Sequence, residues 1–435
     1  MSKITSLFSV LVLCFCFAHT VKAQVSTSNY EQPSCVSLDE EDNLGKVTPD
    51  NLHFVSYHSH QNKNELILTE ISNPTNSQKI ILPNQFSAND MFILLDWIYL
   101  CGAYNGNAAI VKLQLIDFNN PNPQIYISTF PEPDEFTKLE VYIGESDEII
   151  YIAATGRKKN TNSTYTTYLY TMTEENGFIY YYRHGYTNNN YYLYNDVAVT
   201  DNYIVATGLY GIPNTFGITV VDKTTPNIFI WHPYNETSTT IHSKLVDVEA
   251  LTGDTVAVTT VCISPMNYFF IRIYIFNIAS NSILYSQDVP LLEKYDVIEM
   301  EYLNDTARTL LLLQETNYPA SEVNSLFYLI RPFNTSSYIT SFFYNPDSKH
   351  YSLDHFNDGR FLATGELKTG GHAYMIGRKD PNTIPNCVIP GPCKLDINNG
   401  TDLAPTTIEE LQYQTEYYPI TVYSTQTSIK NTCSD

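Results

Sequence analysis

The chain has 435 residues, of which 43% are apolar and 16% are charged, a composition too apolar and too weakly charged for an intrinsically disordered protein. Its 46 acidic residues against 24 basic ones give a formal net charge of −22, which argues against nucleic acid as a partner because phosphate binding needs clustered Lys and Arg. The 35 Tyr and 21 Phe favour strands over helices.

The first 23 residues have the pattern of a secretory signal peptide. Lys3 precedes an apolar run from Ile4 to Ala18, and Val21 and Ala23 stand at the two positions that a signal peptidase reads, so we expect cleavage after Ala23. The alternative is an uncleaved anchor helix, but the run is shorter than the roughly 20 residues that span a bilayer. We therefore expect a secreted or cell-surface protein without a membrane span.

The tripeptide Ala-Thr-Gly recurs through the chain, with its glycines at Gly156, Gly208 and Gly365. The first separation is 208 − 156 = 52 residues, and the second, 365 − 208 = 157 residues, is three such periods plus one. Steps of about 52 residues land on or beside further apolar runs at Phe54–Tyr57, Gly102, Thr260 and Leu312. Repeats of this length indicate a solenoid, a propeller or an array.

Each regular period contains four short strand patterns joined by turn residues. They lie at 196–199, 203–208, 216–221 and 228–231 in the fourth period, and at 245–250, 255–261, 268–276 and 283–286 in the fifth. Asn176-Gly177 in the third period is typical of a tight hairpin. No stretch has sustained helical spacing, so helices should be few. The pattern predicts an all-β fold, a β-propeller of about seven four-stranded repeats of about 52 residues over residues 50–385.

On these repeats the sequence resembles the seven-bladed β-propeller superfold, without matching a named repeat family. Trp-Asp pairs and sialidase Asp boxes are absent, and Gly370-Gly371 is the one Gly-Gly pair of the kind found in Kelch repeats. The resemblance implies a ring of blades that bury one another's faces. It does not assign a function, because this fold hosts lectins, hydrolases, receptors and scaffolds alike.

Two arms flank the predicted propeller: an acidic one at residues 24–49 and one with Pro and Cys at residues 386–435. A strand such as Tyr417–Ser424 could complete a blade from the far end of the chain, and a plain linker is the alternative. Cys101 and Cys262 lie in apolar runs, where a buried thiol and a disulfide are both open. We expect disulfides to hold the arms through Cys35, Cys387, Cys393 and Cys433.

Five sequons for N-glycosylation occur, at Asn162, Asn235, Asn304, Asn334 and Asn399. In a secreted chain these are usable acceptor sites, and they predict surface loops at those positions. We therefore expect a glycoprotein.

An acidic residue stands in the opening strand of most periods. These candidates for the channel wall are Asp90, Glu140, Asp196, Asp247, Glu299 and Asp354. The first strand of a propeller blade lines the central channel, where converging carboxylates repel one another unless a cation or hydrogen-bond donors neutralise them. Two interpretations are open: a funnel for a cation or a cationic ligand, or acids that accept backbone N–H groups at blade junctions.

Two aromatic features have a functional and a plain interpretation. His58 and His60 share one face of a strand and are candidate zinc ligands, or else a solvated pair beside a turn. Tyr180–Tyr182, with Tyr191, Tyr192 and Tyr194, could stack on a sugar or simply pack in the sheets.

The usual catalytic motifs, such as Gly-x-Ser-x-Gly, His-Glu-x-x-His and the Walker loop, are absent, and we expect no cofactor. The leading hypothesis is a binding or scaffold module for an extracellular protein or glycan. The alternative is a secreted glycan-active hydrolase, whose paired carboxyl groups would lie roughly 5 to 9.5 Å apart; Asp196, Asp247 and Glu299 are its first candidates. A third hypothesis treats the chain as the N-terminal fragment of a membrane receptor.

Overall fold

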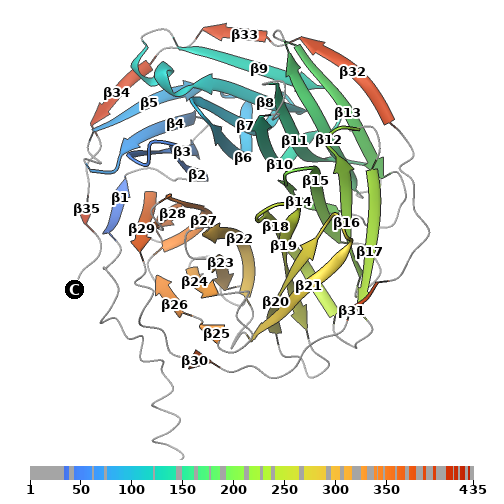
Figure 1. Cartoon of the computed structure of the whole chain (residues 1–435). Helices are drawn as coiled ribbons and strands as arrows, with labels where there is room; N and C mark the ends of the chain where they lie inside the picture. The colour runs from blue at the N-terminus through green and yellow to red at the C-terminus, as the bar shows by residue number, and fades with distance from the viewer. Residues whose placement is uncertain are drawn as a thin grey trace, which may run out of the picture.

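The computed structural model describes residues 34–38 and most of 44–378, together with short strands between 386 and 431. Within these residues the chain forms seven antiparallel sheets of four or five strands, numbered here in the order of their first strands, and one two-stranded sheet. The first strands surround a central space (Figure 1). Each first strand contacts the next, and the last contacts that of sheet 1, so the ring is closed. Four-stranded antiparallel sheets around a channel define a β-propeller.

Sheets 1 to 4 come from residues 44–236. Sheet 1 has β2 (Leu44–Val47), β3 (His53–His60), β4 (Lys63–Glu70) and β5 (Asn76–Leu82). Sheet 2 has β6 (Phe86–Leu94), β7 (Trp97–Tyr104), β8 (Asn107–Gln114) and β9 (Gln124–Phe130). Sheet 3 has β10 (Glu135–Ile143), β11 (Ile150–Lys159), β12 (Tyr165–Glu175) and β13 (Phe178–Tyr186). Sheet 4 has β14 (Leu193–Val199), β15 (Tyr203–Leu209), β16 (Thr215–Asp222) and β17 (Phe229–Glu236).

Sheets 5 to 7 complete the ring. Sheet 5 has β18 (Ile241–Ala250), β19 (Thr255–Ile263), β20 (Phe269–Asn277) and β21 (Ser282–Pro290). Sheet 6 has β22 (Tyr295–Leu303), β23 (Arg308–Glu315), β24 (Ser325–Ile330) and β26 (Ser341–Asn345). Sheet 7 has β27 (Ser348–His355), β28 (Arg360–Leu367), β29 (His372–Arg378) and, from the N-terminal arm, β1 (Ser34–Leu38).

The C-terminal arm runs around the outside of the ring and adds a fifth strand to several sheets (Figure 1). These outer strands are β31 (Leu395–Ile397) on sheet 4, β32 (Ile408–Gln414) on sheet 3, β33 (Glu416–Pro419) on sheet 2, β34 (Val422–Gln426) on sheet 1 and β35 (Lys430–Asn431) on sheet 7. The two-stranded sheet joins β25 (Tyr338–Ile339) to β30 (Asn386–Cys387). Neither arm is therefore separate from the sheets, and the boundary drawn at residue 50 falls inside sheet 1. The segment Tyr417–Ser424 is divided between β33 and β34, whereas β1 supplies the fourth strand of sheet 7.

The positions that repeat in the sequence lie in the second strand of each sheet: Phe54–Tyr57, Gly102, Gly156, Gly208, Thr260, Leu312 and Gly365. Immediately beside the four glycines, the register of the first strand shifts by one residue. A Cβ atom at Gly102 would lie 1.9 Å from the Ser87 carbonyl oxygen across the pair, so no larger residue fits there without a shift of the backbone.

Apolar residues between neighbouring sheets form the core. Val55 and Leu66 of sheet 1 pack with Leu100 and Val111 of sheet 2, and comparable clusters lie between sheets 2 and 3 and between sheets 4 and 5. Alternation along each strand puts apolar side chains on both faces, as a sheet covered on both sides requires. This explains why the strands read as nearly continuous apolar runs.

The prediction of few helices agrees with the structure, because η2 (Leu115–Asn119), a 3-10 helix, is the one helix among the described residues. None of the described residues forms a helix long and apolar enough to cross a membrane. The Asn-Gly hairpin is also present, since Glu175 pairs with Phe178. Asn235 lies in β17 and pairs on both sides, so the expectation of a loop at this sequon is wrong. The signal peptide and the other four sequons lie outside the described residues.

Of the cysteines, Cys101 and Cys262 are buried and form no disulfide. Cys35 and Cys387 lie in β1 and β30, but their side chains, with Cys393 and Cys433, fall outside the described part of the molecule. The predicted disulfides of the arms therefore stay a prediction.

Candidate functional site

A cavity of about 340 Å³ occupies the central channel and is lined by residues from the first strands of all seven sheets. Among the described lining residues are the six predicted acids and two more, Glu249 and Glu301, together with Lys46, Lys138 and His355. Eight carboxylates against two ammonium groups give a formal charge of 2 − 8 = −6 with the histidine neutral. The cavity is thus a strongly acidic site at the axis of the ring.

Most of the acids form two rows, set by the register shifts of the first strands. The residue that follows the shift points into the channel in five sheets, and these residues form the first row: Asp90, Lys138, Asp196, Asp247 and Glu299. Residues two positions further along a strand face the same side and form the second row: Glu140, Glu249 and Glu301, with Asp354 two residues after the shift in sheet 7.

The first-row carboxylates, and Asp354 of the second row, accept backbone N–H groups from the next sheet. Asp90 Oδ2 accepts from the Leu139 N–H at 2.8 Å, and Asp196 Oδ2 from the Val248 N–H at 2.9 Å. The same contact joins Asp247 to Met300, Glu299 to Leu353 and Asp354 to Val47. Five of the six predicted acids therefore tie one sheet to its neighbour, as the second interpretation of their pattern expected.

Two lysines that the sequence analysis missed reach into the channel. Lys46 Nζ lies 3.5 Å from Glu301 Oε1 and 3.8 Å from Glu299 Oε1. Lys138 Nζ, from sheet 3, lies 3.9 Å from Glu299 Oε1 of sheet 6, on the far side of the ring. Burial alone would lower the pKa of both lysines, but the surrounding carboxylates raise it well above its usual value. Both ammonium groups are therefore charged at neutral pH.

Burial dominates the ionisation of the acids. It raises the pKa of Glu299 to about 7, opposed by the charges of Lys46 and Lys138. Burial and neighbouring carboxylates hold the pKa of Glu140 and Glu249 well above its ordinary value. Neither of these two second-row carboxylates makes a hydrogen bond within the described residues. They are the acids of the channel that the fold itself does not use.

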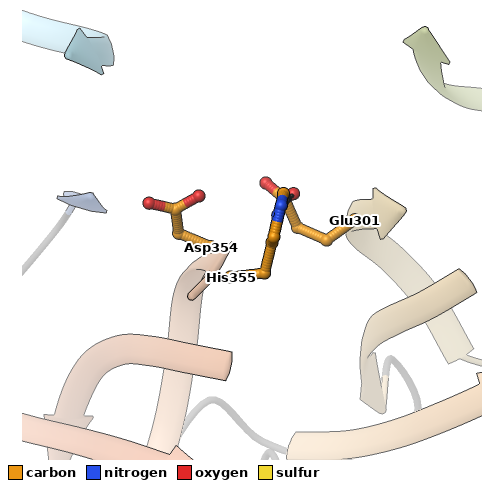
Figure 2. Close-up of side chains that lie close together, drawn as sticks. All are labelled: Glu301, Asp354 and His355. Carbon is orange, nitrogen blue, oxygen red and sulfur yellow. Dashed lines mark hydrogen bonds and ion pairs between the residues drawn. The ribbon is translucent and has the colours of Figure 1, made fainter. Parts of the chain in front are cut away.

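Three side chains converge at the junction of sheets 6 and 7, where Glu301 of β22 faces Asp354 and His355 at the end of β27 (Figure 2). His355 Nδ1 lies 2.9 Å from Glu301 Oε2, and one potential ligand atom of each residue lies within 4.8 Å of the others. The signal in the sequence was the acid two residues after the first-row position, as in Glu299-x-Glu301. The predicted set has a single acid per opening strand in most periods and therefore lacks Glu249 and Glu301.

The other candidates that the structure describes lie outside this site, and Tyr191 and Tyr192 are not among the described residues. His58 is buried in β3 with 1% exposure, so the alternative of a solvated pair at a turn is wrong for it, and the side chain of His60 lies outside the described residues. Tyr181 and Tyr194 are core residues with 2% and 5% exposure, so the plain packing interpretation holds for these two.

The first two candidates for a hydrolase, Asp196 and Asp247, lie close enough to interact. Burial, and after it the charge of Asp196, raises the pKa of Asp247 well above its ordinary value. Each of these residues and Glu299 also accepts a backbone N–H group.

No protein-family model matches the chain, and no curated protein matches it. Among solved structures it is similar to the Dos1 propeller, with 9% identity, a TM-score of 0.46 and coverage of 80% of this chain and 95% of that one. It is also similar to the dihydro-heme d1 dehydrogenase NirN, with 10% identity, a TM-score of 0.42 and coverage of 93% and 76%. It is similar, too, to a mutant of the Synechocystis apocarotenoid oxygenase, with 7% identity, a TM-score of 0.44 and coverage of 92% of this chain and 97% of that one. The fold assignment rests on the strand pairing and the closed ring, and not on these matches.

Proposed function

We propose that this protein is a secreted, N-glycosylated, seven-bladed β-propeller with repeats of about 52 residues that acts as a binding module for an extracellular protein. The signal-peptide pattern and the five sequons support secretion and glycosylation. The proposal includes disulfides that hold the two arms through Cys35, Cys387, Cys393 and Cys433.

The acidic channel carries the proposal for the ligand: the partner inserts a basic side chain, Lys or Arg, beside Glu140 and Glu249. The cavity holds six more carboxylates than ammonium groups among its described residues, and Glu140 and Glu249 make no hydrogen bond there. Such groups gain most from an incoming cation, because it removes their mutual repulsion. A glycan is a poorer fit, since sugars stack on aromatic faces and Phe92 is the one Phe, Tyr or Trp in the described lining.

A peptide-binding experiment tests this proposal. The mature chain, residues 24–435, is immobilised and titrated with a lysine-rich peptide and with the same peptide acetylated on every lysine. We expect saturable binding of the first, weakening as salt is added, and none of the second. The double variant Glu140→Gln with Glu249→Gln should bind about tenfold more weakly. Glu132→Gln, outside the channel, is the matched control and should bind as the wild type does.

Two outcomes would contradict the proposal. One is equal binding of the acetylated peptide, which would show that positive charge is not recognised. The other is undiminished binding by the double variant while its thermal unfolding is unchanged, which would place the peptide elsewhere.

A further inference from the structure

Glu301, Asp354 and His355 form a donor set of two carboxylates and one imidazole on the wall of the channel (Figure 2). We propose that these three side chains bind a divalent transition-metal ion, with Zn²⁺ as the ion that fits best. The site lies in the same cavity as the proposed peptide site but uses neither Glu140 nor Glu249. It therefore does not depend on what partner the protein has.

One pair of the potential ligand atoms has nearly the spacing of a zinc site, and all three atoms lie within 4.8 Å of one another. Bonds of about 2.0–2.2 Å to nitrogen and oxygen place two ligand atoms about 3.3 Å apart in a tetrahedral complex. His355 Nδ1 and Glu301 Oε2 are 2.9 Å apart. These two atoms need to move apart by only a few tenths of an ångström to bind the same ion. Asp354 Oδ2 is held by the Val47 N–H at 2.5 Å, which orients the carboxylate and leaves Oδ1 for the metal.

The donor types select the class of ion. Ca²⁺ and Mg²⁺ are bound by oxygen ligands, whereas imidazole suits Zn²⁺, Cu²⁺ and Ni²⁺. A set of one histidine and two carboxylates gives three protein ligands and leaves a fourth position, open to the channel, for water. Zn²⁺ accepts this arrangement without a redox change.

One of the two carboxylates, Glu301, already contacts a cation, so this part of the wall accommodates positive charge. Lys46 Nζ lies 3.5 Å from Glu301 Oε1, 3.8 Å from Glu299 Oε1 and 3.4 Å from the Leu353 carbonyl oxygen. Lys46 contacts Oε1 of Glu301, whereas His355 contacts Oε2, the other oxygen of the same carboxylate. A metal ion bound to Glu301 is repelled by this charge, so Lys46 sets the affinity of the site.

Titration of the metal-stripped mature chain with Zn²⁺ alone, by calorimetry, tests the site. We expect one equivalent to bind, and His355→Gln to weaken binding by about 10- to 100-fold. Lys46→Met should strengthen it by about tenfold, because it removes a nearby like charge. Glu132→Gln and His53→Gln, an acid and a histidine outside the channel, are the matched controls and should leave the affinity unchanged. Thermal unfolding of each variant checks that it is folded.

Opposite effects of the two variants are specific to the proposed site, since an adventitious surface site responds to neither. The proposal is overturned if no saturable Zn²⁺ binding occurs, or if folded His355→Gln binds Zn²⁺ as tightly as the wild type. X-ray absorption of the zinc complex gives a second readout, with one nitrogen and the rest oxygen ligands expected. Because the probe is the metal alone, this proposal and the peptide-binding proposal can each fail without the other.

Discussion

The carboxylates in the channel have the same chemistry but two different roles. The first-row acids Asp90, Asp196, Asp247 and Glu299 each accept a backbone N–H group from the next sheet, so the fold uses them. Glu140 and Glu249, two residues beyond a first-row position, have no such donor among the described residues. A position within the channel is thus not enough to make an acid a ligand-binding residue. What lies across the junction between sheets decides it.

The register shift explains why the two rows differ. One extra residue in the first strand turns the next side chain inward, beside the first strand of the following sheet, whose N–H group points at the channel. Glu140 and Glu249, two residues further along their strands, have no such donor among the described residues, whereas Asp354, two residues after the shift in sheet 7, accepts the Val47 N–H group. Repetition of the shift around the ring repeats the contact.

The largest effect should come from a first-row acid, and Asp90 is the sharpest case. It accepts the Leu139 N–H at 2.8 Å and the Met91 N–H at 2.9 Å. Asp90→Ala leaves two buried donors without an acceptor and should lower the free energy of unfolding by about 2–3 kcal/mol. Asp90→Asn keeps one of the two acceptor oxygens and should recover about half of this loss. Denaturant unfolding of the wild type and the two variants measures both changes in stability. Equal stability of Asp90→Ala and the wild type would contradict the role of the first-row acids in the fold.

A second-row acid should behave in the opposite way. Burial and nearby carboxylates raise the pKa of Glu140, so the folded state holds that proton more tightly than the unfolded chain. Its contribution to stability is present below the ordinary glutamate pKa of about 4.3 and is lost as pH rises through the higher folded value. Glu140→Gln should therefore gain about 1 kcal/mol over the wild type at pH 7, and none at pH 4. Unfolding midpoints at both pH values check this; a loss of stability at pH 7 would show that Glu140 also serves the fold.

The smallest effect belongs to a carboxylate outside the channel. Glu132 pairs with Lys158 and, at 2.7 Å, with Arg183, and the hydrogen bond from Lys158 lowers the pKa of Glu132. A lowered pKa contributes stability above the unfolded value, and this contribution is lost as pH falls through the folded value. Because the pair is only partly buried and water screens it, Lys158→Gln should cost no more than about 0.5 kcal/mol at pH 7. A larger loss of stability would mean that an ion pair outside the channel can stabilise the fold as much as the channel carboxylates do.

Much of the channel could be predicted from the sequence. The recurring period and the acid in each opening strand were enough to find six carboxylates that line one cavity. The lysines could not be found in this way, because Lys46 and Lys138 look in sequence like any other exposed lysine of a strand. Their role depends on Glu299, which is more than 150 residues away in the chain from either of them.

The sequence by itself determined the strands, their repetition and the inward-facing acids, because these depend on alternation along a single strand and on local turn residues. The tertiary structure decided which carboxylate meets a backbone donor, which meets an ammonium group and where His355 joins Glu301. Those contacts cross from one sheet to another, and a short shift in strand register determines which partners lie in reach. The tertiary structure also decided that β1, and not a C-terminal strand, pairs with β29. Many strands could pair with the edge of β29, and the closed ring determines which of them lies beside it.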